Sequence, residues 1–359
     1  NAKKMYAFSN HVHVTENEGQ SWEIISPDLT RNVPEKLKSS GGPITQDNTG
    51  VEYYCTLFAG GESNLKSGLI WVGSDDGLIH LTKDGGKTWT NVTPKNMPEW
   101  MMINSIDPSP FDPGTCYVSG TKYKTGDFKP YLYRTENYGM TWELITNNIK
   151  NENFTRVLRA DPARKGLLYA GTESGLYISF DDGNSWKPFQ QNLPIVPITD
   201  LTIKDNSLIV ATQGRSLWMI DDLTVLHQLP NSNKNPYLFK PKPTYRLRGS
   251  GGKSSLTMGT NKPNGVEVHF YIPSYDKDSD IVQLSFHDEK GNEIRKFSTS
   301  DDDNKLEVKD GGNIFVWDYK YPGAERFDGM VMWSASLNGA KAVPGTYQVR
   351  LSVNNSEFE

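Results

Sequence analysis

Short apolar runs separated by glycine-containing turns dominate the first part of the chain. Segments 68–79 and 166–177 share one order, in which a glycine, four apolar residues, a second glycine and a polar turn precede another apolar run. Runs of this length bounded by turn residues predict paired β-strands. Upstream, a six-residue strand ending in aspartate recurs at 102–107, 156–161 and 200–205. We expect these to be the innermost strands of their sheets.

One octapeptide of the form Ser/Thr-x-Asp/Asn-x-Gly-x-Ser/Thr-Trp occurs four times, at 15–22, 82–89, 135–142 and 179–186. The starts lie 67, 53 and 44 residues apart, close to the period of about 40 to 50 residues that is typical of propeller blades. Segment 207–222 keeps the strands of the unit but lacks the glycine and the tryptophan of the octapeptide. The repeat predicts about five propeller blades over residues 1–229.

Each part of the octapeptide has a structural role. The short acceptor side chain can hydrogen-bond the amides of its own turn, the glycine supplies a positive φ angle, and the indole packs over neighbouring strands. Two of the four copies carry asparagine at the acidic position, which favours a structural role over catalysis or metal binding. The residues with these structural roles are Asn17, Gly19, Trp22, Asp84, Gly86, Trp89, Asn137, Gly139, Trp142, Asp181, Gly183 and Trp186.

The amino-acid composition of the chain changes after Leu229. A stretch rich in proline, asparagine and lysine covers residues 230–243 and is typical of a linker. Alternating runs follow at 266–272, 281–286, 313–318 and 346–353, separated by turn residues. They predict a small antiparallel β-sandwich over residues 244–359. The fold class expected for the whole chain is therefore all-β, a partial propeller followed by a sandwich.

Charge and length exclude some partners. The chain has 359 residues and a net charge of −5 with both signs dispersed, so we expect no nucleic-acid ligand, because no basic stripe is present. No apolar run is long enough to span a bilayer, and residues 1–6 lack the layout of a signal peptide.

Cys55 and Cys116 each lie in an apolar run, which favours two buried thiols over a disulfide.

The octapeptide resembles the Asp-box of the BNR-repeat superfamily, which includes sialidases, xyloglucanase-type glycoside hydrolases, photosystem assembly factors and sortilin-type propellers. Segments 41–45, 74–80 and 211–218 are similar to large exported bacterial proteins described as sortilin-like or as glycosyl hydrolases. Segments 311–318 and 343–350 resemble the immunoglobulin-like domain of flagellar hook-capping type. These resemblances imply an extracellular, cell-surface or periplasmic protein with a C-terminal spacer module. Because the first blade has no upstream strand and about five blades do not comfortably close a ring, we also expect further propeller blades N-terminal to this chain.

Candidate acids lie on the turns that precede the octapeptides. Asp75, Asp76 and Glu173 occupy these turns, and a glycosidase needs two carboxyl groups about 5 to 10 Å apart. The competing interpretation is that these side chains hydrogen-bond the backbone of their turns. With these acids, Trp71 and Trp100 would line a cleft. The arginine-isoleucine-proline strand that a sialidase resemblance implies is absent from the sequence.

Charged residues on the expected inner strands are candidates for ligand binding. Arg156 and Asp200 share one register of successive strands, and Arg159 and Arg215 can join them in lining a channel. The competing interpretation is a set of ordinary salt bridges between blades. His11 and His13 alternate along a strand, but no third ligand accompanies them. No phosphate-binding loop or catalytic triad signature is present, so we expect no metal and no cofactor.

Two classes of function follow. In the first, the propeller binds a peptide, protein or glycan without catalysis of its own. In the second, it is a glycoside hydrolase of xyloglucanase-like or sialidase-like type that uses carboxylates on its face. A hydrolase requires paired acids with exposed aromatic side chains, whereas a binding propeller does not.

Overall fold

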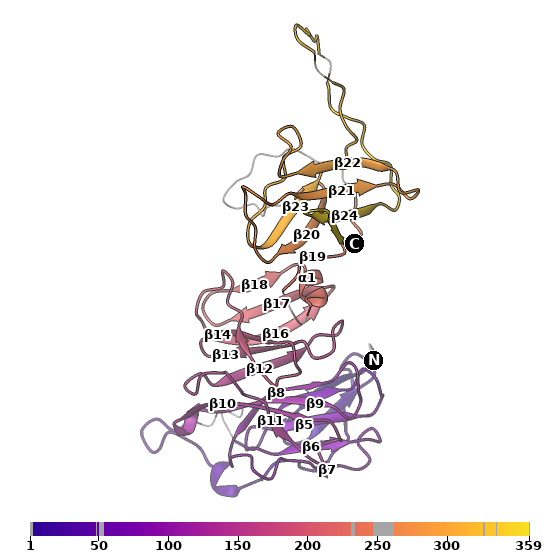
Figure 1. Cartoon of the computed structure of the whole chain (residues 1–359). Coiled ribbons are helices and arrows are strands. Elements are labelled where there is room, and N and C mark those ends of the chain that lie inside the picture. Colours follow the sequence, from indigo (N-terminus) through magenta and orange to yellow (C-terminus); the bar gives the residue numbers. More distant parts are fainter. Residues whose placement is uncertain are drawn as a thin grey trace. The chain divides into compact units, whose positions relative to one another are not determined.

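A computed structural model describes residues 3–47, 49, 54–230, 234–246, 262–325, 327–334 and 336–358. Contacts between residues divide the chain into two compact units, residues 1–223 and 224–359. Within the described residues the secondary structure is almost entirely β-strand, and the all-β prediction is confirmed. Figure 1 shows the strands of both units.

The described residues of the first unit form five antiparallel sheets that follow one another along the chain in a propeller arrangement. Three sheets have four strands, which we call A to D from the innermost strand outwards. The innermost strands of neighbouring sheets contact each other. The sheets are β1 (Met5–Phe8), β2 (Val12–Thr15), β3 (Glu23–Ile24); β4 (Leu57–Glu62), β5 (Ile70–Ser74), β6 (Ile79–Thr82), β7 (Thr90–Asn91); β8 (Met102–Pro108), β9 (Cys116–Lys122), β10 (Asp127–Thr135), β11 (Glu143–Leu144); β12 (Thr155–Ala160), β13 (Leu168–Thr172), β14 (Gly175–Ser179), β15 (Lys187–Pro188); and β16 (Ile198–Lys204), β17 (Ser207–Thr212), β18 (Leu217–Ile220).

The strands predicted to be innermost are β8, β12 and β16, at the position expected for them. Because each sheet is an antiparallel meander, the turn between strands B and C lies at the same end as the loop that leads into strand A. A repeated backbone bond ties the two together: the amides of Asp75, Glu173 and Gln213 donate to the carbonyls of Thr56, Phe154 and Pro197 at 2.9, 3.0 and 2.9 Å. We call this end of the sheets the B–C end, and the opposite one the C–D end.

The four octapeptides form the turns of the C–D end, and their side chains close each turn from within. The hydroxyl of Thr82 donates to Oδ1 of Asp84 at 2.8 Å and accepts the amide of Gly86 at 3.0 Å. Oδ1 of Asp84 also accepts the amide of Thr88 at 2.9 Å. The same bonds recur in the other three copies. Asparagine and aspartate are therefore equivalent here, because only an acceptor oxygen is required.

The octapeptide glycines and indoles join neighbouring sheets. The indole nitrogens of Trp89, Trp142 and Trp186 donate to carbonyls of the preceding sheet at 2.9, 2.7 and 2.7 Å. Trp22 belongs to the first sheet and is 43% exposed. Gly86 has φ +98°, and a Cβ there would lie 2.6 Å from the carbonyl oxygen of Ile25. The octapeptide thus requires glycine for both its backbone angle and its contact with the preceding sheet.

Apolar side chains fill the space between adjacent sheets. Trp71 has no exposed surface, packs at right angles to Trp142, and belongs to the cluster between the second and third sheets. The sequence-based interpretation of Trp71 as part of a cleft is therefore wrong, since strand B buries both of its faces in a propeller. Cys55 and Cys116 are both buried and free, as the composition favoured.

The second unit contains a short helix and two antiparallel sheets with a shared core. The helix is α1 (Thr224–Gln228). One sheet contains β19 (Tyr237–Leu238), β20 (Val266–Ile272) and β23 (Gly311–Trp317), and the other contains β22 (Glu293–Ser298), β21 (Val282–His287), β24 (Gln348–Val353) and β25 (Ser356–Phe358). Phe286 and Trp317 stack between the sheets with ring centroids 4.6 Å apart. The four predicted strands correspond to β20, β21, β23 and β24.

The region expected to be a linker contains structure of the second unit. Residues 237–238 form β19, which pairs with β20 at Tyr271 and Phe270. Leu238 and Phe239 are buried. The division between the units lies at Leu223, six residues before the expected boundary at 229. Proline and lysine on both sides of residues 237–239 made this edge strand hard to recognise, because edge strands tolerate proline.

Candidate functional site

The B–C end of the first unit gathers aromatic and charged side chains from three consecutive sheets. Tyr54 and Trp100 lie on the loops that lead into β4 and β8, and their rings meet edge to face with centroids 6.1 Å apart. Trp100 has φ +59°, a strained angle for an aromatic residue. Arg31 and Lys36 lie over the Trp100 ring, 5.2 and 5.5 Å from its centroid. Both cations can make cation–π contacts there.

A second aromatic group belongs to the third and fourth sheets. Tyr123, in the helical turn η3 (Tyr123–Thr125) between β9 and β10, stacks on Phe154 with ring centroids 5.0 Å apart and planes inclined by 14°. Phe128 leans on Phe154 at 6.2 Å and keeps 51% of its surface exposed. Phe154 itself is buried beneath the other two rings. Arg156 lies 5.2 Å from the Phe154 centroid.

The two groups are neighbours. Burial raises the pKa of Tyr54, and the negative charge of Asp75 raises this pKa further, with a smaller effect from the Tyr123 phenol. Lys124 is close enough to Asp75 to act on the pKa of that carboxyl. We call this surface the aromatic face and define it by Tyr54, Trp100, Tyr123, Phe128 and Phe154, with Arg31, Lys36, Lys124 and Arg156 around them.

The three candidate acids all lie at the B–C end, but in different environments. Asp76 has no exposed surface, since Oδ2 accepts the Arg31 amide at 2.7 Å and Oδ1 accepts the Ser74 hydroxyl at 2.5 Å. Asp75 is partly exposed, and its Oδ1 accepts the amides of Cys55 and Thr56 at 3.0 and 2.9 Å. Both side chains therefore have a structural role, but they hold amides of other loops rather than the backbone of their own turn, as the competing interpretation of the sequence had it.

Asp75 nevertheless has properties that suit a proton donor. Burial raises its pKa above the ordinary value, the negative charge of Asp76 raises it further, and the two amides lower it. No hydrogen bond to Oδ2 is present among the described residues. A raised pKa on a carboxyl with one free oxygen is the property that a proton donor needs.

Glu173 and two of the predicted ligand-binding arginines form ion pairs. Arg156 binds Glu173 through Nε and Nη2 at 2.7 and 2.6 Å. Arg159 binds Asp200 at 2.8 Å, across β12 and β16, and also donates to Ser105. Arg156 and Asp200, which share one register in the sequence, thus have different ion-pair partners.

Arg215 is exposed on the B–C turn of the last sheet, where it donates to the carbonyl of Gly214 at 3.0 Å. His11 and His13 each bond a protein oxygen, the Ser26 carbonyl at 3.1 Å and the Ser9 hydroxyl at 2.8 Å. Over the described part of the chain, no group of three possible metal ligands is found.

Sequence reasoning found Trp100 but missed the rest of the aromatic face. Tyr54, Tyr123, Phe128 and Phe154 are far apart in sequence and belong to no motif. Their common signal is position relative to the repeat, because each lies on a B–C turn or just before a strand A. Aligning the loops by the repeated strands, rather than searching for motifs within them, would have placed them at one end.

A groove of about 940 Å³ lies elsewhere in the first unit, between the outer strands of the second and third sheets. Its lining includes Lys83, Val92, Tyr138 and Trp142, so it belongs to the C–D end. Lys83 lies 4.0 Å from the Tyr138 ring centroid and covers part of the groove. The groove contains none of the candidate acids.

No described helix is long and apolar enough to cross a membrane. No known protein family matches the chain by its sequence profile. A curated relative, the oligoxyloglucan-reducing end-specific xyloglucanase of Emericella nidulans, is 26% identical over 113 residues, which are 30% of this chain and 13% of the relative. The chain therefore spans about an eighth of that protein's length.

Among solved structures, an ancestral GH74 enzyme has a TM-score of 0.42 and 15% identity, covering 82% of this chain and 36% of that one. The GH74 xyloglucanase from Xanthomonas campestris has a TM-score of 0.41 and 15% identity, covering 61% and 34%. YCF48 bound to D1 peptide has a TM-score of 0.35 and 19% identity, covering 44% and 48%. The chain thus spans less than half of each of these structures.

Proposed function

We propose that the first unit binds a glycan on its aromatic face, as part of a protein of the xyloglucan-directed glycoside hydrolase kind. The observation that carries the proposal is the pair of ring clusters, Tyr54 with Trp100 and Tyr123 with Phe128 and Phe154. An aromatic ring has a negatively charged face that attracts C–H groups and cations. A pyranose ring presents a flat patch of C–H groups, so two adjacent ring clusters provide stacking positions for neighbouring sugars.

The polar groups around the rings support a neutral, hydroxyl-rich ligand. Arg31, Lys36 and Lys124 supply donors, and Asp75 and Glu173 supply acceptors, so the face has both kinds of hydrogen-bonding partner. A nucleic acid would need a more uniformly basic surface. The xyloglucanase relative favours a β-glucan over a peptide, and it favours the glycoside hydrolase over the purely binding function, two possibilities that the sequence left open.

The test is a binding titration with xyloglucan oligosaccharides and with cello-oligosaccharides. Phe128→Ala removes an exposed ring of the face, and we expect it to weaken binding about 5- to 30-fold, the range of an aromatic contact residue. The matched control is Phe111→Ala, which removes a ring that is 40% exposed in the loop between β8 and β9, at the C–D end. Equal losses in both variants, or no saturable binding of any glycan, would contradict the proposal.

Hydrolysis is a separate expectation with its own readout. Asp75 would donate the proton to the leaving oxygen, because its pKa is raised, and Glu173 is a partly exposed carboxyl at the same end. With release of reducing sugar as the assay, Asp75→Asn should abolish turnover while leaving the oligosaccharide affinity intact. Asp76→Asn, a buried neighbour, is the control for folding. Turnover that survives Asp75→Asn would remove Asp75 from the mechanism without affecting the binding proposal.

A further inference from the structure

A hairpin of the second unit, residues 319–342, exposes an apolar tip. Val331 and Trp333 are 94% and 95% exposed, and Phe327 is 70% exposed. Figure 1 shows the two arms of this hairpin leaving the sheets side by side. The arms pair through a bridge between Lys320 and Lys341 and a bond from the Tyr321 amide to the Ala340 carbonyl at 2.9 Å. A contiguous apolar tip of this kind on a soluble protein marks a contact surface.

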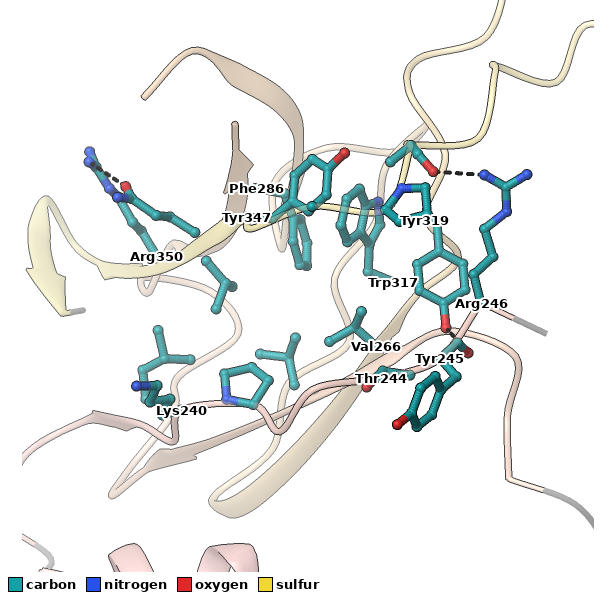
Figure 2. Close-up of a pocket in the computed structure, with 18 of the residues that line it drawn as sticks. Lys240, Thr244, Tyr245, Arg246, Val266, Phe286, Trp317, Tyr319, Tyr347 and Arg350 are labelled. Carbon is teal, nitrogen blue, oxygen red and sulfur yellow. Dashed lines mark hydrogen bonds between the residues drawn. The ribbon is translucent and has the colours of Figure 1, made fainter. Parts of the chain in front are cut away.

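The base of the same hairpin borders an open aromatic pocket of about 790 Å³. Trp317, Tyr319 and Ala342 belong to the base and line the pocket together with Phe286 and Tyr347. Figure 2 shows these rings along one side of the pocket, with Val266 facing them. The volume lies within the range of about 300 to 1,000 Å³ that holds a drug-sized molecule or several side chains.

The charges of the pocket and the tip are complementary. The pocket lining includes Lys240, Arg246 and Arg350, and no carboxylate occurs among its described residues. In Figure 2, Lys240 and Arg350 lie on one side of the pocket and Arg246 on the other. Around the apolar residue Phe327 the sequence of the tip carries Glu325, Arg326 and Asp328, a net charge of −1.

We propose that the pocket receives the hairpin tip of a second copy of this chain, in a reciprocal exchange. Because each copy carries both the tip and the pocket, a two-fold axis can satisfy both at once and close the assembly as a dimer. The tip of each hairpin then lies at the base of its partner's hairpin, with the two hairpins antiparallel. This arrangement buries the three apolar side chains and places two carboxylates near the cationic rim.

The area favours two insertions over one. Burial of two aromatic side chains and a valine removes roughly 500 Å² of tip surface from water, and the pocket, whose rings are largely buried, loses less. One insertion therefore buries less than about 1,000 Å², below the roughly 1,200 to 2,000 Å² of a stable interface, whereas two insertions double that area and bring it into this range. A one-sided partner would leave the interface undersized.

The test is the oligomeric state of the full chain, measured by sedimentation over a range of concentrations. We expect a dimer whose dissociation constant rises more than about 100-fold in Trp333→Ser, since a buried tryptophan is lost at both sites. Val343→Glu, at a pocket residue that is 68% exposed, should dissociate the dimer equally, because it places a carboxylate opposite the acidic tip. Ile314→Ser, 64% exposed on β23 and outside the pocket, is the control and should stay dimeric.

Mixing the two defective variants gives the sharpest result. The Trp333→Ser chain retains a sound pocket and the Val343→Glu chain a sound tip, so a mixture should form heterodimers where neither variant alone dimerises. A wild-type chain that stays monomeric to about 100 µM overturns the proposal. Dissociation by Trp333→Ser but not by Val343→Glu also overturns it, because the tip would then dock on another surface, whether of a different protein or of a membrane.

Discussion

At the level of single residues, the B–C end shows how one position in a repeated turn can be either structural or chemical. Asp75 and Asp76 are adjacent, and both were predicted as candidates from the sequence alone. Their difference comes from their hydrogen-bond partners: Arg31 and Ser74 bond both oxygens of Asp76, whereas Oδ2 of Asp75 has no hydrogen bond among the described residues. No local pattern distinguishes the two, because the discriminating contacts are tertiary.

Asp107 gives a residue-scale prediction about pH. It lies in the strand position that recurs with aspartate, accepts the Ala160 amide at 2.7 Å, and has a pKa raised by burial to about 6 from the ordinary 3.8. Native Asp107 therefore retains its proton between pH 4 and 6, where the unfolded chain has lost it. Its contribution to stability is full below about pH 4 and is lost as the pH rises through 6, by up to about 3 kcal/mol.

Denaturant unfolding between pH 4 and 8 checks this prediction. Asp107→Asn should flatten the decline in the free energy of unfolding, because the amide carries no titrating proton. Asp205→Asn is the matched control, since Asp205 has the equivalent place in its own repeat but an 84% exposed side chain. A pH profile that Asp107→Asn leaves unchanged would show that the decline has another origin.

At the level of elements, the octapeptide is the feature that sequence predicted best. Its hydroxyl, acceptor and amide bonds are local, so four residues of pattern contain the information needed to form the turn. The pattern did not reveal that the indole and the glycine contact the preceding sheet. The residues they contact, Ile25, Val92 and Ile145, lie in another blade, and the octapeptide itself does not specify them. The turn is local, but the junction between sheets is not.

Gly85 and Gly86 separate these two contributions within one turn. Both have positive φ, +76° and +98°, but a Cβ on Gly85 has no atom within 4 Å, whereas one on Gly86 would meet the Ile25 carbonyl oxygen at 2.6 Å. We expect Gly85→Ala to cost about 1 to 2 kcal/mol from backbone strain alone. Gly86→Ala should cost a further 1 to 3 kcal/mol, roughly, from the clash.

Thermal unfolding of the two variants measures the difference. A larger loss of stability in Gly86→Ala than in Gly85→Ala would show that Gly86 is needed for the close contact between the two sheets. Equal losses in the two variants would mean that the neighbouring sheet yields without cost and that only the φ angle matters.

At the level of the whole molecule, composition and repeat spacing were enough to predict an all-β chain with propeller sheets followed by a second β unit. The functional surface was less accessible to sequence, because a propeller assembles it from loops of several blades. Tyr54 and Tyr123 belong to different sheets, and their proximity follows only from the meander that returns every B–C turn to one end. The fold thus follows from local sequence patterns, whereas the functional surface depends on residues that are far apart in the sequence.

The second unit follows the same logic. Its strands alternate clearly enough to be predicted, whereas β19 and the hairpin at 319–342 depend on pairing with distant segments. The exposed Trp333 has no explanation within one copy of the chain, so its role is to be sought in an assembly. That expectation is independent of the glycan-binding proposal, because the hairpin and its pocket lie in the second unit only.

The central claim is the location of the binding face, and hydrogen–deuterium exchange with and without a xyloglucan oligosaccharide tests it most directly. We predict slower exchange in peptides that contain Trp100 and in those spanning residues 122–130, with unchanged exchange in the octapeptide turns at 82–89 and 135–142. Protection confined to those turns or to the second unit, or no protection at saturating oligosaccharide, would contradict the account.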